Sequence, residues 1–325
     1  MPQERQKVTS IRTRFAPSPT GYIHLGNVWV AFLNWWWTRQ HGGKIILRIE
    51  DIDRQRCRVE YAEAMMEDLS WLGLDWDEGP EKEEAYGSLV QSRRTGFYQQ
   101  IVSTWKEEGL IYPCYCTRAR LRSIASAPHE GEGRPIYDGR CRALTEEERA
   151  RETKIPSWRL KAEKETVSFV DMFCGEKKRT LLPGRDDIVL IRADGMMAYQ
   201  LAATADDGAM GITHVFRGND LLMSTFDQIS ILKKLGYKVP TYGHLPLLVD
   251  ADGIRLSKRQ HGITLRSLRE AGKKPGDILG KLLFWAGAID RDHKSMSADE
   301  ILRNLPFSSC QSLSKKHILA NVDLS

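Results

Sequence analysis

The sequence predicts an α/β protein with a doubly wound parallel core, an α+β insertion and a helical C-terminal segment. Strand-like and helix-like segments alternate over residues 11–108. This alternation returns at about residue 196, after a stretch that differs in composition and has weaker helical periodicity. Such alternation is typical of parallel sheets covered by helices. With 325 residues, of which 41% are hydrophobic and 28% charged, the chain has room for one large domain or two to three modest ones.

The first half of the core is predicted from turn signals and hydrophobic periodicity. Gly42 and Gly43 separate a helical pattern from an apolar strand, and Gly73 ends the next helix. We expect the three consecutive tryptophans at positions 35–37 to lie mainly in the core, because aromatic side chains bury large areas. The expected elements are, in order, a strand before Pro17, a helix over 28–37, a strand over 44–50, and helices over about 60–72 and 95–108.

The composition of the sequence changes near Tyr112, where Arg, Glu, Gly and Pro become frequent and helical periodicity weakens. We interpret residues 112–195 as an insertion between two halves of the core. The predicted domains are 1–111, 112–195, 196–250 and 251–325. The expected elements after the change are strands over 157–162, 166–172, 187–192 and 214–217, a helix over about 225–235, and mainly helix from 266 to the end.

Bulk properties exclude several classes of protein. No apolar run reaches the length of a membrane-spanning helix, and residues 1–10 are polar and lack a secretory h-region, so we expect a cytoplasmic protein that does not contact membranes. The net charge of +5 is compatible with a polyanionic partner but does not demand one. The six cysteines are not spaced like a disulfide framework.

The segment Gly21–Asn27 is the most informative part of the sequence. His24 and the glycines around it lie where a strand is expected to give way to a helix, and α/β sheets bind phosphate groups at such points. A basic loop, Arg255–Arg259, lies far downstream. The imidazole and backbone N–H groups on one side, and the ammonium of Lys258 on the other, would stabilise charge that develops on the α-phosphate and pyrophosphate of ATP. Alone, either motif would also fit a helix cap or a solvated turn.

A second cluster consists of Cys114, Cys116 and Cys141, whose spacing favours a zinc site over a disulfide in a cytosolic chain. Three free thiols are the alternative. The spacing leaves the fourth ligand open, because His129 and water are ordinary ligands whereas tyrosine is an unusual one. The other cysteines lie outside this spacing and are expected to bind no metal: Cys57, Cys174 and Cys310.

Three motifs resemble those of the glutamyl-tRNA synthetases. Arg14–Asn27 is similar to the HIGH region of that family, Arg48–Arg54 to its next signature, and Leu256–Arg259 to its KMSKS loop. The similarity covers most of the chain to about residue 290. These enzymes are class I synthetases, so the resemblance implies a Rossmann catalytic domain that is split by a zinc-containing insertion, which meets the tRNA acceptor end. It also implies adenylation of glutamate with ATP and Mg²⁺.

The resemblance also assigns roles to individual residues. His24 and Lys258 would be catalytic, the first at the α-phosphate and the second at the departing pyrophosphate. Glutamate carries two carboxylates and one ammonium, and Arg14, Arg217 and Glu50 would supply the matching charges. The implied glutamate-binding residues are Arg14, Phe15, Ala16, Pro17, Ser18, Glu50, Tyr199 and Arg217; the implied ATP-binding residues are His24, Gly26, Asn27, Ser257 and Lys258; and the implied ligands of one structural Zn²⁺ are Cys114, Cys116, Tyr137 and Cys141.

Two departures from the family pattern resemble a truncated branch, the glutamyl-Q tRNA(Asp) synthetases. Only 67 residues follow Lys258, which leaves no room for a helical anticodon-binding domain, and Ala203 stands where the family has an asparagine. Residues 217–225 and the Cys–Tyr–Cys spacing also resemble this branch. The resemblance implies an enzyme that activates L-glutamate without tRNA and then esterifies queuosine at the wobble position of tRNA(Asp). We expect a monomer.

Two alternatives are compatible with the sequence. One is an ordinary glutamyl- or glutaminyl-tRNA synthetase that lacks its anticodon domain, and the other is a non-catalytic RNA-binding protein descended from a synthetase. The presence of His24, Glu50 and Lys258 argues against the non-catalytic alternative.

Overall fold

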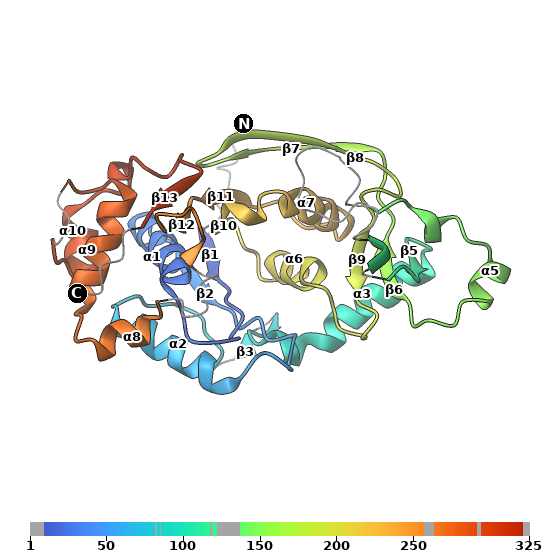
Figure 1. Ribbon diagram of the computed structural model, residues 1–325, viewed down its shortest axis with the longest axis horizontal. Coiled ribbons are helices and arrows are strands. Elements are labelled where there is room, and N and C mark those ends of the chain that lie inside the picture. Colours follow the sequence, from blue (N-terminus) through green and yellow to red (C-terminus); the bar gives the residue numbers. More distant parts are fainter. Residues whose placement is uncertain are drawn as a thin grey trace, which may run out of the picture.

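The computed structural model describes residues 10–81, 83–84, 86–117, 119–121, 137–256, 263–290 and 294–320. The molecule is elongated, with the C-terminal helices at one end, the insertion at the other and the core between them (Figure 1). Within the described ranges, no helix is long and apolar enough to cross a membrane.

The described strands are β1 (Arg12–Phe15), β2 (Lys44–Leu47), β3 (Glu83–Glu84), β4 (Gly87–Ser88), β5 (Ile111–Cys114), β6 (Ser157–Leu160), β7 (Glu165–Asp171), β8 (Gly175–Leu181), β9 (Ile188–Ile191), β10 (His214–Gly218), β11 (Thr241–Leu245), β12 (Leu247–Val249) and β13 (His317–Leu319). The described α-helices are α1 (Leu25–Gln40), α2 (Val59–Trp71), α3 (Thr95–Glu107), α5 (Glu146–Ala150), α6 (Tyr199–Ala209), α7 (Ser224–Lys234), α8 (Leu265–Glu270), α9 (Pro275–Ala286) and α10 (Ala298–Asn304).

A parallel arrangement of strands forms the centre of the core and confirms the predicted α/β class. β1 pairs with β2 from Arg12↔Lys44 to Phe15↔Leu47, and β10 pairs with β11 in the same parallel sense. The N–H of Thr213 donates to the carbonyl of Arg12 at 2.9 Å, which joins the two pairs edge to edge. The carboxyl ends of β1 and β10 therefore lie together, at the edge where open α/β sheets bind ligands.

Helix α1 is apolar on nearly all sides because it lies between the core strands and the C-terminal segment. Trp35, Trp36 and Trp37 are 4%, 0% and 8% exposed, which confirms their predicted place in the core. The ring of Trp36 stacks on Phe32 with centroids 5.7 Å apart, and it meets Phe307 edge-on at 5.2 Å. Full burial of one such side chain is worth roughly 1.5–3 kcal/mol. The helix that begins at the predicted phosphate loop is therefore firmly anchored.

The described part of the insertion contributes to two sheets. β5, β6 and β9 form an antiparallel sheet, whereas β7 and β8 form a hairpin with the register Glu165↔Leu181 to Asp171↔Gly175. β7 also pairs with β11 at Asp171↔Tyr242, and the hairpin runs along one side of the molecule (Figure 1). β8 is missing from the predicted elements because its sequence, GEKKRTL, is largely exposed and carries little apolar signal.

The C-terminal segment is only partly helical. α8, α9 and α10 agree with the helices predicted from residue 266, but β13 pairs in parallel with β12 from Leu247↔His317 to Val249↔Leu319. The prediction of helix to the end of the chain is therefore wrong at β13. This strand has three residues, which is too short for its periodicity to be distinguished from that of a helix.

Candidate active site

A cavity of about 290 Å³ opens at the carboxyl ends of β1 and β10, beside the N-terminus of α1. Both halves of the core contribute to its wall. Pro17 and Ser18 belong to the described chain but lie outside this wall, and Ser257 and Lys258 lie outside the described residues. The predicted site residues that line the cavity are Arg14, Phe15, Ala16, His24, Gly26, Asn27, Glu50, Tyr199 and Arg217.

His24 is the N-cap residue of α1 and lines the cavity. Its Nδ1 accepts a hydrogen bond from the backbone N–H of Asn27 at 3.3 Å. Burial lowers the pKa of His24, so the ring is neutral at pH 7 and carries its proton on Nε2, where it can donate to a ligand. A Cβ on Gly26 would lie 3.1 Å from Nδ1 and Cε1 of this ring. Glycine at this position therefore leaves room for the imidazole.

Described residues on both sides of segment 257–262, which includes the predicted Lys258, lie near the same cavity. Arg255 lines the cavity before the segment begins. After the segment ends, the carbonyl of Ile263 accepts a hydrogen bond from the N–H of Leu25 at 3.2 Å. The first residue of the basic loop, Arg255, and the residue after the segment, Ile263, thus lie near the predicted phosphate loop, although the two loops are far apart in the sequence.

Arg217 is buried at the end of β10 and is held by neutral side chains. Its Nε donates to Nε2 of His244 at 3.0 Å, and its terminal nitrogens donate to Oε1 of Gln228 and Oγ1 of Thr225, each at 2.6 Å. These contacts use three of the five guanidinium N–H donors and do not neutralise its charge. The other donors and the positive charge match a carboxylate entering the cavity.

His244 is a neutral imidazole with its proton on Nδ1. Because Nε2 accepts from Arg217, the other ring nitrogen donates, and it lies 2.6 Å from Oδ2 of Asp171. Burial lowers the pKa of His244, against the effect of its hydrogen bond to Asp171. Burial alone would raise the pKa of Asp171, but hydrogen bonds from His244 and from the backbone of Cys174 and Phe173 lower it. The chain from Asp171 through His244 therefore orients Arg217 from behind.

Arg14 lies in a buried network of alternating charges. Its Nε donates to Asp207 at 3.1 Å, and Arg48 bridges Asp207 at 2.8 Å and Glu50 at 3.0 Å. Burial raises the pKa of Glu50, and Arg48 and Arg14 oppose this effect. Burial alone would raise the pKa of Asp207, but Arg14 and Arg48 outweigh it and lower the pKa. The network compensates the charge of Arg14 while Glu50 still lines the cavity.

Sequence reasoning missed the residues that support this network from α6. Asp206 and Asp207 are adjacent acidic residues in a helix, a pattern that usually indicates a solvated face. Here both are buried, and Asp206 accepts from Nε of Arg94 at 2.7 Å and from the hydroxyl of Tyr98 at 2.8 Å. Most other residues of α6 are small or apolar, which is typical of a helix that is buried on all sides. This pattern could have indicated that Asp206 and Asp207 are buried as well.

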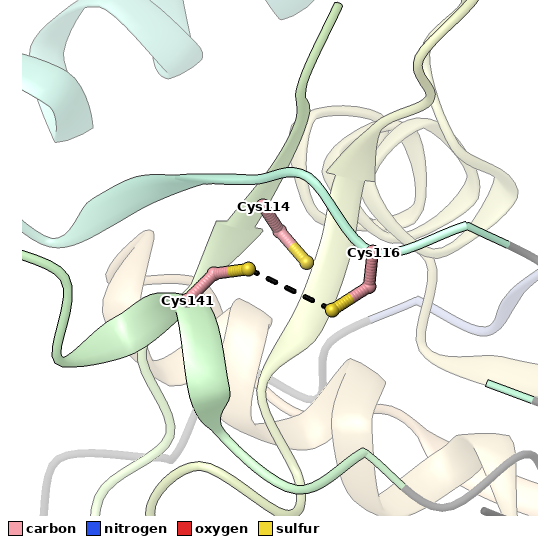
Figure 2. Close-up of side chains that lie close together, drawn as sticks. All are labelled: Cys114, Cys116 and Cys141. Carbon is pink, nitrogen blue, oxygen red and sulfur yellow. Dashed lines mark hydrogen bonds between the residues drawn. The ribbon is translucent and has the colours of Figure 1, made fainter. Parts of the chain in front are cut away.

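The sulfur atoms of Cys114, Cys116 and Cys141 lie within 4.8 Å of one another (Figure 2). Those of Cys116 and Cys141 are 3.6 Å apart. Two sulfurs at about 2.3 Å from one tetrahedral ion would be about 3.8 Å apart. Tyr137 belongs to the same buried cluster, and its oxygen accepts from the N–H of Cys141 at 3.0 Å. The three thiols can hold one metal ion, while His129 lies outside the described residues.

Known proteins share this fold and much of this sequence. The family model for tRNA synthetases class I (E and Q), catalytic domain, matches residues 10–318. A glutamyl-Q tRNA(Asp) synthetase of Symbiobacterium thermophilum is 49% identical over 86% of this chain and 87% of that protein. Another of that name, from Nitratidesulfovibrio vulgaris, is 48% identical over 86% of this chain and 87% of its own.

Glutamate–tRNA ligases are also similar. One from Syntrophus aciditrophicus is 38% identical over 90% of this chain, which spans 61% of that ligase. The crystal structure of a glutamate tRNA ligase from Elizabethkingia meningosepticum in complex with its amino acid matches with a TM-score of 0.76 at 28% identity, over 93% of this chain and 66% of that one. The chain therefore belongs to the class I tRNA synthetases (E and Q), a family of ligases, and within it resembles the glutamyl-Q tRNA(Asp) synthetases.

Proposed function

We propose that this enzyme activates L-glutamate with ATP, without tRNA, and transfers the glutamate to queuosine at the wobble position of tRNA(Asp). The observation that carries the proposal is the cavity shared by His24, Glu50 and Arg217 at the N-terminus of α1. In the first step, a carboxylate oxygen of glutamate attacks the α-phosphorus of ATP and the bond to pyrophosphate breaks. In the second, a hydroxyl of the queuosine diol attacks the activated carbonyl and AMP leaves.

Charge complementarity supports glutamate as the amino acid. Arg217 and Arg14 bring two guanidinium groups to the cavity wall, which matches the two carboxylates of the substrate. Glu50 brings a carboxylate for the ammonium group, held in position by Arg48. Tyr199, at the start of α6, lines the same cavity and would close it over the substrate. Phe15 and Ala16 would complete the wall, and Pro17 and Ser18, which follow them in the chain, would contact glutamate from beyond the lining.

The phosphates of ATP would lie at the start of α1. Backbone N–H groups and the positive end of the helix dipole attract phosphate there, and Gly26 and Asn27 line the approach. His24 would donate from Nε2 to the α-phosphate as negative charge develops on it. Lys258, with Ser257 beside it, would reach the pyrophosphate from a loop whose neighbours already lie near the cavity. Mg²⁺ that accompanies ATP supplies positive charge between the phosphates.

We also propose that Cys114, Cys116, Tyr137 and Cys141 hold one structural Zn²⁺. Thiolate ligands select zinc in sites of this kind, and a closed set of four protein ligands is typical of a structural role. The ion would fix the start of the insertion, which we take as residues 112–195 between core segments 1–111 and 196–250, with a helical segment from 251. Metal analysis of the purified protein tests this proposal: three titratable thiols at these positions and no stoichiometric metal would contradict it.

The relatives support queuosine as the acceptor. The two glutamyl-Q tRNA(Asp) synthetases share 49% and 48% of aligned residues with this chain, compared with 38% for the glutamate–tRNA ligase of Syntrophus aciditrophicus. Ala203 agrees with this proposal, since it is buried in α6 one turn beyond Tyr199 and offers no side-chain hydrogen bond.

Two assays test the proposed function. Exchange of pyrophosphate into ATP with glutamate but no tRNA measures activation, and we expect it to proceed. Transfer of labelled glutamate is then compared between tRNA(Asp) with and without queuosine, tRNA(Glu) and tRNA(Gln). We expect transfer only to the queuosine-containing tRNA. Periodate treatment of the charged tRNA should then cleave the terminal ribose diol and leave the cyclopentene diol intact, because esterification protects the diol that carries glutamate. Charging of tRNA(Glu) at its 3′ end would instead identify an ordinary glutamate–tRNA ligase.

A further inference from the structure

A second cavity, of about 410 Å³, lies between the insertion and the core. Its wall includes Tyr137 and Arg159 from the insertion and Tyr199 and Gln200 from the start of α6. Tyr199 also lines the cavity proposed for glutamate, so the two cavities adjoin at this side chain. The volume lies within the range of about 300–1,000 Å³ that is typical of small-molecule sites.

The wall of this second cavity contains polar atoms that need partners. Within the described residues, no hydrogen-bond partner is found for Oε1 of Gln200, Nε of Arg159 or Nε of Arg192, and each of these atoms is shielded from solvent. Buried polar atoms in native proteins nearly always have a partner, because leaving one unmatched is destabilising. Three residues that line one cavity thus carry one acceptor and two donors without partners, which side-chain rotation would bring to a ligand that has both N–H or O–H groups and oxygen or nitrogen acceptors.

The charged groups of this wall are arranged so that the cavity favours an electron-rich ligand. Arg159 lies over the ring of Tyr137 at 4.1 Å and donates to the backbone carbonyl of Asp187 at 2.9 Å. The carboxylate of Asp187 is occupied by Arg142 at 2.7 Å and by a tyrosine hydroxyl, so it does not neutralise Arg159. Arg192 pairs with the exposed Asp194 at 2.6 Å and lies 4.0 Å from Asp53.

We propose that this cavity binds the modified nucleoside that accepts glutamate. This inference rests on the proposed function and deepens it. The 7-deazaguanine base and cyclopentene diol of queuosine carry both N–H and O–H donors and oxygen acceptors, as the wall demands. After small side-chain rotations, Oε1 of Gln200 accepts from the ligand, and Nε of Arg159 and of Arg192 donate to its oxygens. A nucleoside held there has its diol beside Tyr199, at the boundary with the glutamate cavity.

The geometry separates the two half-reactions. Gln200 and Arg192 line the second cavity and are not among the residues that line the cavity proposed for glutamate and ATP. Ester formation joins the two cavities: the diol oxygen bonds to the glutamyl carbonyl carbon, the bond from that carbon to AMP breaks, and the hydroxyl proton passes to the departing phosphate. Loss of a wall residue should thus impair transfer and spare activation.

The test compares Gln200→Leu and Arg192→Lys with the wild type and with a control, Gln311→Leu, at an exposed position outside both cavities. Arg192→Lys keeps the charge but removes the Nε donor. For each protein, glutamate-dependent pyrophosphate exchange measures activation, and kcat/KM for queuosine-containing tRNA(Asp) measures transfer. We expect activation within about twofold of the wild type, which also reports correct folding, and transfer reduced about 10- to 100-fold in the two wall variants. Free queuosine nucleoside should inhibit transfer by the wild type more strongly than by Gln200→Leu.

The outcomes separate this inference from the proposed function. If the wild type transfers no glutamate to queuosine-containing tRNA, the proposed function itself fails. If the wild type transfers glutamate and the wall variants do so equally well, the cavity holds only water and the inference is overturned. Equal losses of activation and transfer would also overturn it, because the cavity would not be specific to the acceptor. Inhibition by free queuosine nucleoside that is equally strong for the wild type and Gln200→Leu would overturn it too, because the nucleoside would then bind elsewhere.

Discussion

Arg14 and Arg217 line the same cavity from neighbouring strands, yet they are held in opposite ways. Arg14 bonds directly to the carboxylate of Asp207, which also binds Arg48. Arg217 bonds to three neutral side chains, and the nearest carboxylate in its chain of contacts, that of Asp171, lies behind His244. The first arginine is neutralised by the protein, whereas the second keeps its charge for a ligand.

This difference explains how one cavity can bind a substrate that carries charges of both signs. A fully compensated network around Arg14 and Glu50 keeps a cation and an anion side by side in a buried place, where isolated charges would be costly. Among the described residues, buried Arg217 donates only to neutral side chains, so it gains most when a carboxylate arrives. We therefore expect substitutions around Arg217 to weaken glutamate binding, and substitutions around Arg14 to weaken the fold as well.

The largest effect is expected for Arg217→Gln. The variant removes the positive charge that the protein itself does not neutralise, so activation of glutamate, measured as kcat/KM in pyrophosphate exchange, should fall about 100- to 1,000-fold. Arg217→Lys is the matched control. It restores charge but not the planar fork that meets Thr225, Gln228 and His244 together, and it should recover only part of the loss. Activity of Arg217→Gln close to that of the wild type would remove Arg217 from the substrate site.

A large effect on stability is expected for Asp207→Asn. The change leaves Arg14 and Arg48 buried with one carboxylate fewer, and breaking a buried pair in this way costs about 3 kcal/mol of the free energy of unfolding. Urea denaturation followed by tryptophan fluorescence measures it. Glu60→Gln, which breaks the exposed pair with Arg58, is the control and should change stability by less than about 1 kcal/mol. Similar denaturation midpoints for the two variants would contradict the network described for Arg14.

A smaller effect is expected for His244→Phe. The variant fills the space but removes the acceptor for Nε of Arg217, so the guanidinium loses orientation while its charge persists. The KM for glutamate should rise about tenfold, with kcat for activation changed much less. His244→Gln offers an amide oxygen in place of Nε2 and should restore part of the affinity. A fall in kcat alone, or no rescue by glutamine, would show that His244 acts only through packing.

The sequence predicts the parts of this site that have local signatures. His24 before an apolar helix indicates a cap at a phosphate loop, whereas the roles of Arg14 and Glu50 are implied only by the resemblance of their motifs to those of the glutamyl-tRNA synthetases. The supporting residues have no such signature. Asp171 reaches His244 because β7 pairs with β11, and Asp206 reaches Arg94 because α6 packs beside α3. These contacts depend on tertiary packing between distant segments, so hydrophobic periodicity does not reveal them.

The smallest effect on stability is expected in an acid titration. It compares the carboxylate of Asp171, behind Arg217, with that of Asp207, beside Arg14. Hydrogen bonds from His244 and the backbone lower the pKa of Asp171 against the effect of burial. Because the folded-state pKa lies below the unfolded value of about 3.9, the ionised carboxylate stabilises the fold above that pH, and this contribution is lost as the pH falls through the lowered pKa. The difference in denaturation midpoint between the wild type and Asp171→Asn should therefore be constant from pH 7 to 5 and shrink below about pH 4.

The pKa of Asp207 is also lowered, so Asp207→Asn should follow the same pH course. Its effect at pH 7 should be larger, since Asp207 touches two arginines whereas Asp171 touches a neutral imidazole. Equal losses of stability at pH 7 would mean that His244 is charged in the folded protein. In that case Nε2 of His244 could not accept from Arg217. The conclusion that neutral side chains hold Arg217, in contrast to Arg14, would then be wrong.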